Sequence, residues 1–166
     1  MSDPWVKTGV RWRFRPTGRG GSRAAELGLN ERQDALSVAP LFAALSKRHL
    51  RDLARVSGVT ERPEGATVVK EGASGSVFYV ILDGAVKVVR KGRTIARLRR
   101  GEFFGEMSLL DGQPRVASVV TEAPSRFLTL SAKDFRAALD RDPALARRVL
   151  REMALRLRER EKPPAG

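Results

Sequence analysis

The sequence contains no cysteine and only one histidine among its 166 residues. Without cysteine there is neither a disulfide framework nor a thiolate metal site, and His49 alone argues against a metal held by histidines. No run of about 18 apolar residues is present, and the start lacks the charged, apolar and small segments of a signal peptide. We therefore expect a soluble, cytoplasmic protein that has no metal and does not associate with a membrane.

The sequence has an excess of positive charge, with a net charge of +13. Such a charge predicts attraction to anions such as nucleotides, nucleic acids or acidic lipid headgroups. The basic residues are mostly arginine, however, and they are scattered over the first residues, the central region and the last helix. A codon bias toward arginine would give the same total, so the charge by itself does not favour a nucleic-acid partner.

Residues 1–36 differ in composition from the rest, since Pro4, Pro16 and the glycine-rich run 18–22 interrupt regular structure. We interpret them as a flexible basic tail and expect order to begin near Ser37. Apolar and basic residues alternate within the tail, namely Val10, Trp12 and Phe14 with Arg11, Arg13 and Arg15. That alternation also fits a strand, or an arm that stacks on bases and pairs with phosphates.

Apolar residues at helical spacing predict two short helices between Ser37 and Gly58. The first is an apolar patch over 41–45, and the second is capped by Ser46 and stopped by Gly58. His49 lies in the second helix, where we expect a partly exposed side chain without a ligand.

Between Val59 and Leu130 the apolar period changes to two, and turn glycines recur. Asp83-Gly84 and Lys91-Gly92 are two-residue hairpin signals, because glycine readily adopts the positive φ of the primed turns. The predicted strands are Thr67–Lys70, Val77–Leu82, Ala85–Arg90, Arg93–Leu98, Arg115–Thr121 and Arg126–Leu130. Many short, closely spaced strands predict a small sandwich or jelly roll over about 59–130.

Two helices follow the strands. Ser131 begins a capping box for Ala132–Leu139, and Asp142-Pro143 supplies an N-cap and a first-turn proline for a helix to about Glu161. One apolar stripe runs along the last helix, made of Leu145, Val149, Met153 and Leu157. The stripe either packs on the strands or joins a second copy of the chain. The fold class is α+β, an antiparallel β-roll flanked by N-terminal helices and a C-terminal helix pair, in one domain over 37–166.

The stretch Gly101–Ser118 has the parts of a small anion site. Gly105 allows close backbone approach, and the residues after it can form a helical turn whose amides point at a negative charge. Arg115 can clamp a phosphate through two parallel hydrogen bonds, and Glu106 can accept a sugar hydroxyl while tethered by Arg115. The alternative is a surface Glu and Arg in an ordinary loop of the roll.

The runs Gly101–Leu110 and Pro114–Val119 resemble the cyclic-nucleotide-binding domain family of catabolite-activator regulators, cyclic-nucleotide-dependent kinase regulatory subunits and cyclic-nucleotide-gated channels. The run Phe78–Val88 is similar to the family's central hairpin, and the resemblance covers about 37–161. It implies that Arg115 and the amides of Ser108 and Val116 hold the cyclic phosphate. It also implies that the Gly105 backbone and Glu106 bind the ribose 2′-hydroxyl. The resemblance further implies that the base pocket is lined by Val88, Ala96, Met107 and Arg156.

Two departures from the family pattern concern the base. Val116 stands where the family has Ala, Ser or Thr, so no side-chain hydroxyl is offered to a guanine, which favours cyclic AMP over cyclic GMP. Arg160 and Glu161 replace the small hydroxylic residues that some relatives use against adenine, which leaves base contacts from the last helix open.

No nucleophile–base pair, metal cluster or Walker-type loop is found in the sequence, so we expect neither an enzyme nor a cofactor. No helix-turn-helix follows the last helix before Gly166. The expected protein is a sensor that passes ligand occupancy to an unidentified protein partner, or to a second copy as a homodimer through the last helix. One alternative is a degenerate domain that serves protein interaction without ligand, and another is nucleic-acid binding through the basic tail.

Overall fold

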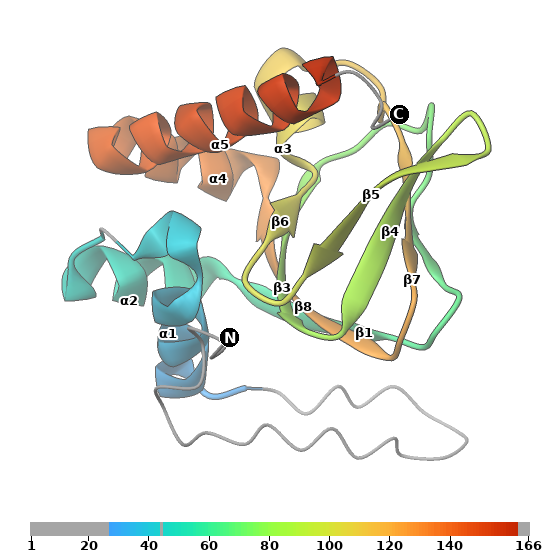
Figure 1. Ribbon diagram of the computed structural model, residues 1–166. Coiled ribbons are helices and arrows are strands. Elements are labelled where there is room, and N and C mark those ends of the chain that lie inside the picture. Colours follow the sequence, from blue (N-terminus) through green and yellow to red (C-terminus); the bar gives the residue numbers. More distant parts are fainter. Residues whose placement is uncertain (1–26, 44, 163–166) are drawn as a thin grey trace.

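The structure is a computed structural model that describes residues 27–43 and 45–162. Two antiparallel sheets of four strands each form a roll, and the N-terminal helices and the C-terminal helix pair gather on one side of it (Figure 1). This arrangement confirms the predicted α+β roll. Most of the expected basic tail, including the stretch around Trp12 for which a strand or a basic arm is the alternative, lies outside the described residues.

Each sheet combines strands that are far apart in the sequence. The first has the order β1-β8-β3-β6, made of Gly58–Arg62, Ser125–Ser131, Val77–Asp83 and Phe103–Phe104. The second has the order β2-β7-β4-β5, made of Thr67–Val69, Ser118–Thr121, Ala85–Arg90 and Arg93–Arg99. The glycines of the two predicted hairpin turns, Gly84 and Gly92, both have a positive φ.

The helices begin where the capping residues predict. Ser46 accepts a hydrogen bond at the start of α2 (Lys47–Val56), and Ser131 does so at the start of α4 (Ala132–Arg141). Asp142 caps α5 (Pro143–Glu161) by accepting from two backbone amides. The remaining helices are α1 (Leu29–Val38), the 3-10 turn η1 (Pro40–Phe42) and α3 (Glu106–Asp111).

The prediction that order begins near Ser37 is wrong, because α1 already starts at Leu29. Leu36 of α1 is fully buried, and the Gly28 amide donates to the Glu31 carboxylate at 2.7 Å. A polar helix that buries few side chains shows only a weak hydrophobic periodicity in its sequence, which is why it was not predicted. Packing against the rest of the domain stabilises such a helix.

Two strands were not predicted, and the start of a third differs from the prediction. Gly58 does not simply end a helix but begins β1, which pairs with β8, and the short β6 pairs with β3. β7 starts at Ser118 rather than at Arg115, because Arg115 pairs with the loop after β2. Such pairings depend on the partner strand, which a local sequence pattern does not contain.

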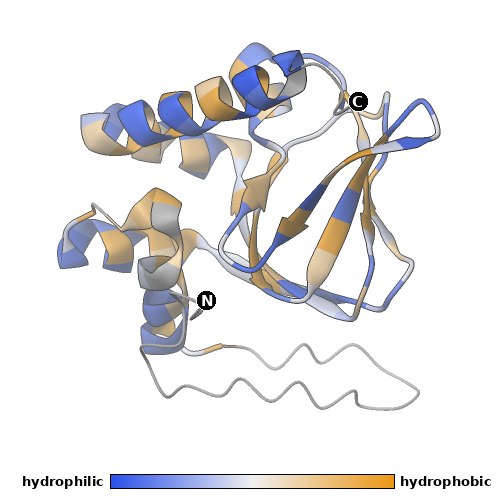
Figure 2. Ribbon diagram, viewed as in Figure 1, coloured by the Kyte–Doolittle hydropathy of each residue, from blue (hydrophilic) through white to orange (hydrophobic). Residues whose placement is uncertain are grey.

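Two apolar clusters fill the interior. One packs the helices on the first sheet, where Phe135 of α4 stacks on Phe78 with ring centroids 4.4 Å apart. The other lies between the sheets around Phe104 and Phe127. Hydrophobic and hydrophilic residues alternate along α5 (Figure 2).

The apolar stripe of α5 divides into two parts. Leu145 and Val149 are buried in the first cluster and Met153 packs against it, whereas Leu157 is 58% exposed. The first two turns therefore anchor α5 to the roll, and the last turns of the stripe leave the core.

Candidate functional site

A cavity of about 520 Å³ lies between α3, the β4–β5 hairpin and α5. Its volume is in the range of small-molecule sites. Every site residue expected from the sequence lines it, namely Val88, Ala96, Gly105, Glu106, Met107, Ser108, Arg115, Val116 and Arg156. Because these residues come from five separate segments, the fold brings them together as predicted.

Arg115 is a buried cation at the floor of the cavity, with 7% of its surface exposed. Its Nη1 donates to the Gly105 carbonyl and its Nη2 to the Val77 carbonyl, each at 2.8 Å. Burial lowers the pKa of the guanidinium from its ordinary value, and Tyr79 and Glu106 oppose that shift. An arginine remains protonated in such surroundings, so the cavity has a fixed positive charge.

Glu106 is a buried carboxylate, only 4% exposed, at the start of α3. Its Oε1 accepts a hydrogen bond from Arg156 of α5 at 2.9 Å. Arg156 also donates to the Phe103 carbonyl at 2.6 Å and lies over the Phe103 ring at 4.3 Å. The expectation that Arg115 tethers Glu106 is thus wrong, because Arg115 is turned toward backbone carbonyls and Arg156 takes its place. A carboxylate accepts several hydrogen bonds, so Glu106 retains capacity for a hydroxyl.

The turn before α3 requires glycine. Gly105 has φ +92°, and a Cβ there would lie 2.8 Å from the Val77 carbonyl oxygen. From this turn the chain enters α3, whose first amides have no partner inside the helix by its geometry, and Ser108 is the third residue. The residues that carry these amides line the same cavity as Arg115.

Apolar residues of β4, β5 and the segment before β7 also line the cavity. Val88 and Ala96 are paired across β4 and β5, and Val116 is 38% exposed. α5 contributes residues that the sequence reasoning missed, namely Glu152, Leu155 and Glu159. Their spacing of three to four residues around Arg156 puts them on one helix face, which is the signal that could have found them. Glu161 is exposed.

A cavity with one buried cation, one buried carboxylate and several apolar lining residues can hold a small molecule that carries an anion, a hydroxyl and a flat apolar part. Among the described residues there is no cluster of His, Asp and Glu that could hold a metal ion. No helix in the same part of the chain is long and apolar enough to cross a membrane.

Comparison with known proteins assigns this arrangement to a family. Residues 59–142 match the family model of the cyclic nucleotide-binding domain. The chain is 37% identical over 127 residues to the cyclic AMP receptor protein of Thermus thermophilus, covering 72% of this chain and 58% of that protein. It is 33% identical over 106 residues to a cAMP-dependent protein kinase regulatory subunit of Aspergillus fumigatus, covering 63% and 26%. The chain thus spans less than two thirds of either relative's length.

A solved structure agrees with these matches. A cyclic nucleotide-binding domain from Methylobacillus flagellatus KT has a TM-score of 0.67 and 31% identity. The similarity covers 81% of this chain and 83% of that one.

Proposed function

Because this chain belongs to the cyclic nucleotide-binding domain family, we propose that its cavity binds cyclic AMP and that the chain acts as a sensor rather than as an enzyme. The observation that carries the proposal is the position of Arg115 and Glu106. A buried cation and a buried carboxylate line one cavity, as a cyclic phosphate beside a ribose hydroxyl would require.

Arg115 would bind the exocyclic oxygens of the phosphate. Its two bonds to backbone carbonyls occupy one N–H on each terminal nitrogen, and the guanidinium has five N–H donors. The remaining donors can clamp a phosphate in the planar geometry that lysine lacks. The amides of Ser108 and Val116 would add to the cradle, and the Gly105 backbone with Glu106 would bind the ribose 2′-hydroxyl.

The choice of base rests on the apolar walls. Val88, Ala96 and Met107 would pack against the purine, with Arg156 and its α5 neighbours closing the far side. Val116 presents no hydroxyl to accept a hydrogen bond from the 2-amino group of guanine, so adenine is favoured over guanine.

Binding of the ligand would be communicated to a partner through α5. This helix is anchored to the core at Leu145 and reaches the cavity at Arg156, so a ligand that contacts Arg156 favours one position of its last turns. A protein partner or a second copy would read that position. Leu150 and Leu157 are 64% and 58% exposed on α5 and would form the contact in a homodimer.

Titration calorimetry of the whole chain with cyclic AMP and cyclic GMP tests the proposal. We expect cyclic AMP to bind more tightly, and Arg115→Ala to weaken it by about 10-fold to 100-fold, since a charged hydrogen bond is worth about 1.5–3 kcal/mol. Arg93→Ala, which removes an exposed arginine of β5, is the matched control and should change little. If neither nucleotide binds at millimolar concentration, the sensor proposal fails and a ligand-free interaction domain replaces it.

A further inference from the structure

The guanidinium of Arg115 lies close to two glycines, Gly75 and Gly105. A Cβ at Gly75 would overlap the Nε, Cζ and Nη2 atoms of Arg115. A Cβ at Gly105 would lie 3.0 Å from Nη1 of the same guanidinium. A side chain at Gly75 would therefore occupy the same space as the guanidinium, and one at Gly105 would crowd it.

The two glycines are required for different reasons. Gly105 has φ +92°, a conformation that other residues rarely adopt, so any substitution there strains the backbone. Gly75 is not among the glycines with positive φ, and an alanine can adopt its backbone conformation. The three atoms nearest to a Cβ at Gly75 all belong to Arg115, so the space taken by Arg115 excludes a side chain there. Because the overlapping atoms are the far end of a flexible side chain, an added methyl group would displace the arginine rather than the main chain.

The loop that contains Gly75 also fixes the main chain of Arg115. The Arg115 amide donates to the Ala73 carbonyl, and the Gly72 amide donates to the Arg115 carbonyl, each at 2.8 Å. These two hydrogen bonds resist a shift of the Arg115 backbone. We therefore expect the side chain to rotate away from a new methyl group, which breaks its bonds to the carbonyls of Val77 and Gly105.

We propose that Gly75 is a positioning residue for ligand binding, because the absence of a side chain there leaves the space in which the Arg115 guanidinium lies. The proposal rests on the proposed function, in which Arg115 clamps the phosphate. It assigns a binding role to the loop between β2 and β3, which supplies none of the residues that line the cavity.

The first test is calorimetry with cyclic AMP on Gly75→Ala. We expect an affinity at least about 10-fold weaker, with a thermal unfolding midpoint close to that of the unaltered chain. Ser74→Ala, at the exposed neighbouring position, is the control and should bind normally. In the Arg115→Ala background, Gly75→Ala should cost no further affinity, because the two changes act on one interaction. Unchanged affinity overturns the proposal, and so does a Gly75→Ala chain that fails to fold.

The second test does not depend on ligand. The Nε–Hε resonance of Arg115 can be assigned in the ligand-free protein by its loss in Arg115→Ala, and we expect it to shift in Gly75→Ala but not in Ser74→Ala. If the unaltered chain binds no cyclic AMP, the proposed function fails. The Arg115 resonance then still tests whether Gly75 determines the position of the Arg115 side chain. A resonance that Gly75→Ala leaves in place overturns the inference.

Discussion

Arg156 of α5 and Glu106 of α3, fifty residues apart in the chain, form a hydrogen-bonded ion pair of 2.9 Å at the edge of the cavity. Glu106 is buried and Arg156 is partly exposed, so the pair joins the interior of the site to the helix that covers it. The carboxylate is oriented by α5 rather than by Arg115. The state of the proposed ribose site is thereby coupled to the position of the last helix.

Loss of this pair should weaken ligand binding. In Arg156→Ala the buried Glu106 carboxylate loses its cationic partner, which costs about 1.5–3 kcal/mol for a charged hydrogen bond. We expect cyclic AMP affinity to fall about 10-fold or more and the thermal midpoint to drop, measured by calorimetry and by thermal unfolding. Arg158→Ala removes an exposed arginine of the same helix and serves as the control. Equal affinities for the two variants would show that Glu106 does not need Arg156.

A hydroxyl at position 116 should change the preference between bases. Val116 lines the cavity, and Val116→Thr keeps its shape while adding an oxygen that can accept from the 2-amino group of guanine. We expect cyclic GMP affinity to rise about 3-fold to 10-fold, the worth of one neutral hydrogen bond, with cyclic AMP affinity little changed. Competition binding measures both. Val116→Ala, which adds no hydroxyl, should not show the gain, and a gain in both variants would contradict the interpretation.

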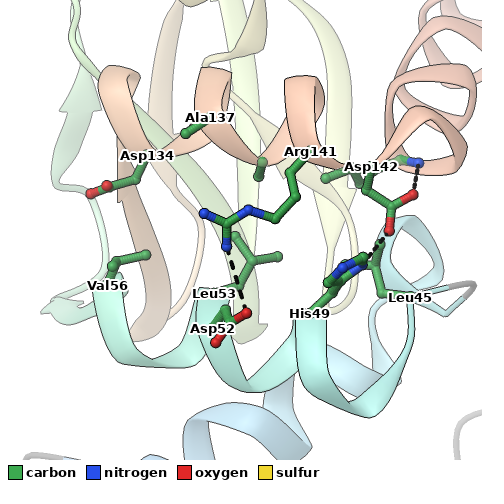
Figure 3. A pocket seen from close by; sticks show the side chains of 11 residues that line it. Leu45, His49, Asp52, Leu53, Val56, Asp134, Ala137, Arg141 and Asp142 are labelled. Carbon is green, nitrogen blue, oxygen red and sulfur yellow. Dashed lines mark hydrogen bonds and ion pairs between the residues drawn. The ribbon is translucent and has the colours of Figure 1, made fainter.

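His49 and Asp142 connect α2 to the start of α5. Figure 3 shows the two side chains pointing toward one another across the pocket between α2 and α4, with His49 Nδ1 and Asp142 Oδ2 2.7 Å apart. Burial raises the pKa of Asp142, while bonds from His49 and from the amides of Leu145 and Ala144 lower it by more, so the net shift is downward from 3.8. His49, for which we expected a partly exposed side chain, therefore contacts the residue that caps α5.

A lowered carboxyl pKa means that ionised Asp142 stabilises the folded chain above about pH 3.8 and that this contribution disappears as the pH falls through the folded-state pKa. We expect Asp142→Ala to lower the free energy of unfolding by about 1–2 kcal/mol at neutral pH, as for other N-caps. The difference from the unaltered chain should shrink on acidification, as measured by urea unfolding. Asp140→Ala, at an exposed position of α4, is the control. A difference that is constant with pH would contradict this role of Asp142.

The exposed leucines of α5 should form the contact between two copies of the chain. Leu145 and Val149 are buried in the core, so a second copy would use Leu150 and Leu157 instead. We expect sedimentation velocity to show a dimer and the double change Leu150→Glu with Leu157→Glu to give a monomer. Val56→Ser, which alters an exposed apolar residue of α2, should leave the dimer intact. A monomer for the unaltered chain, with and without cyclic AMP, would contradict dimerisation through α5.

Short sequence patterns, such as helix caps and the motif around Arg115, were enough to predict much of the fold and which residues line the cavity. Capping residues such as Ser46, Ser131 and Asp142 mark helix starts because a side-chain oxygen satisfies amides within three residues. Gly105 and Arg115 were recognisable because their surroundings form one continuous motif. Those interactions extend over a few residues, and a linear sequence displays them directly.

The tertiary structure decided what depends on distant segments. It gave Glu106 the partner Arg156 rather than Arg115, it paired His49 with Asp142, and it placed the Arg115 guanidinium in the space that a side chain at Gly75 would fill. The stripe on α5 could equally have been core or interface, and burial separates Val149 from Leu157. In each case the pairing depends on which surfaces meet once the sheets and helices have packed. A residue's own neighbours in the sequence do not contain that information.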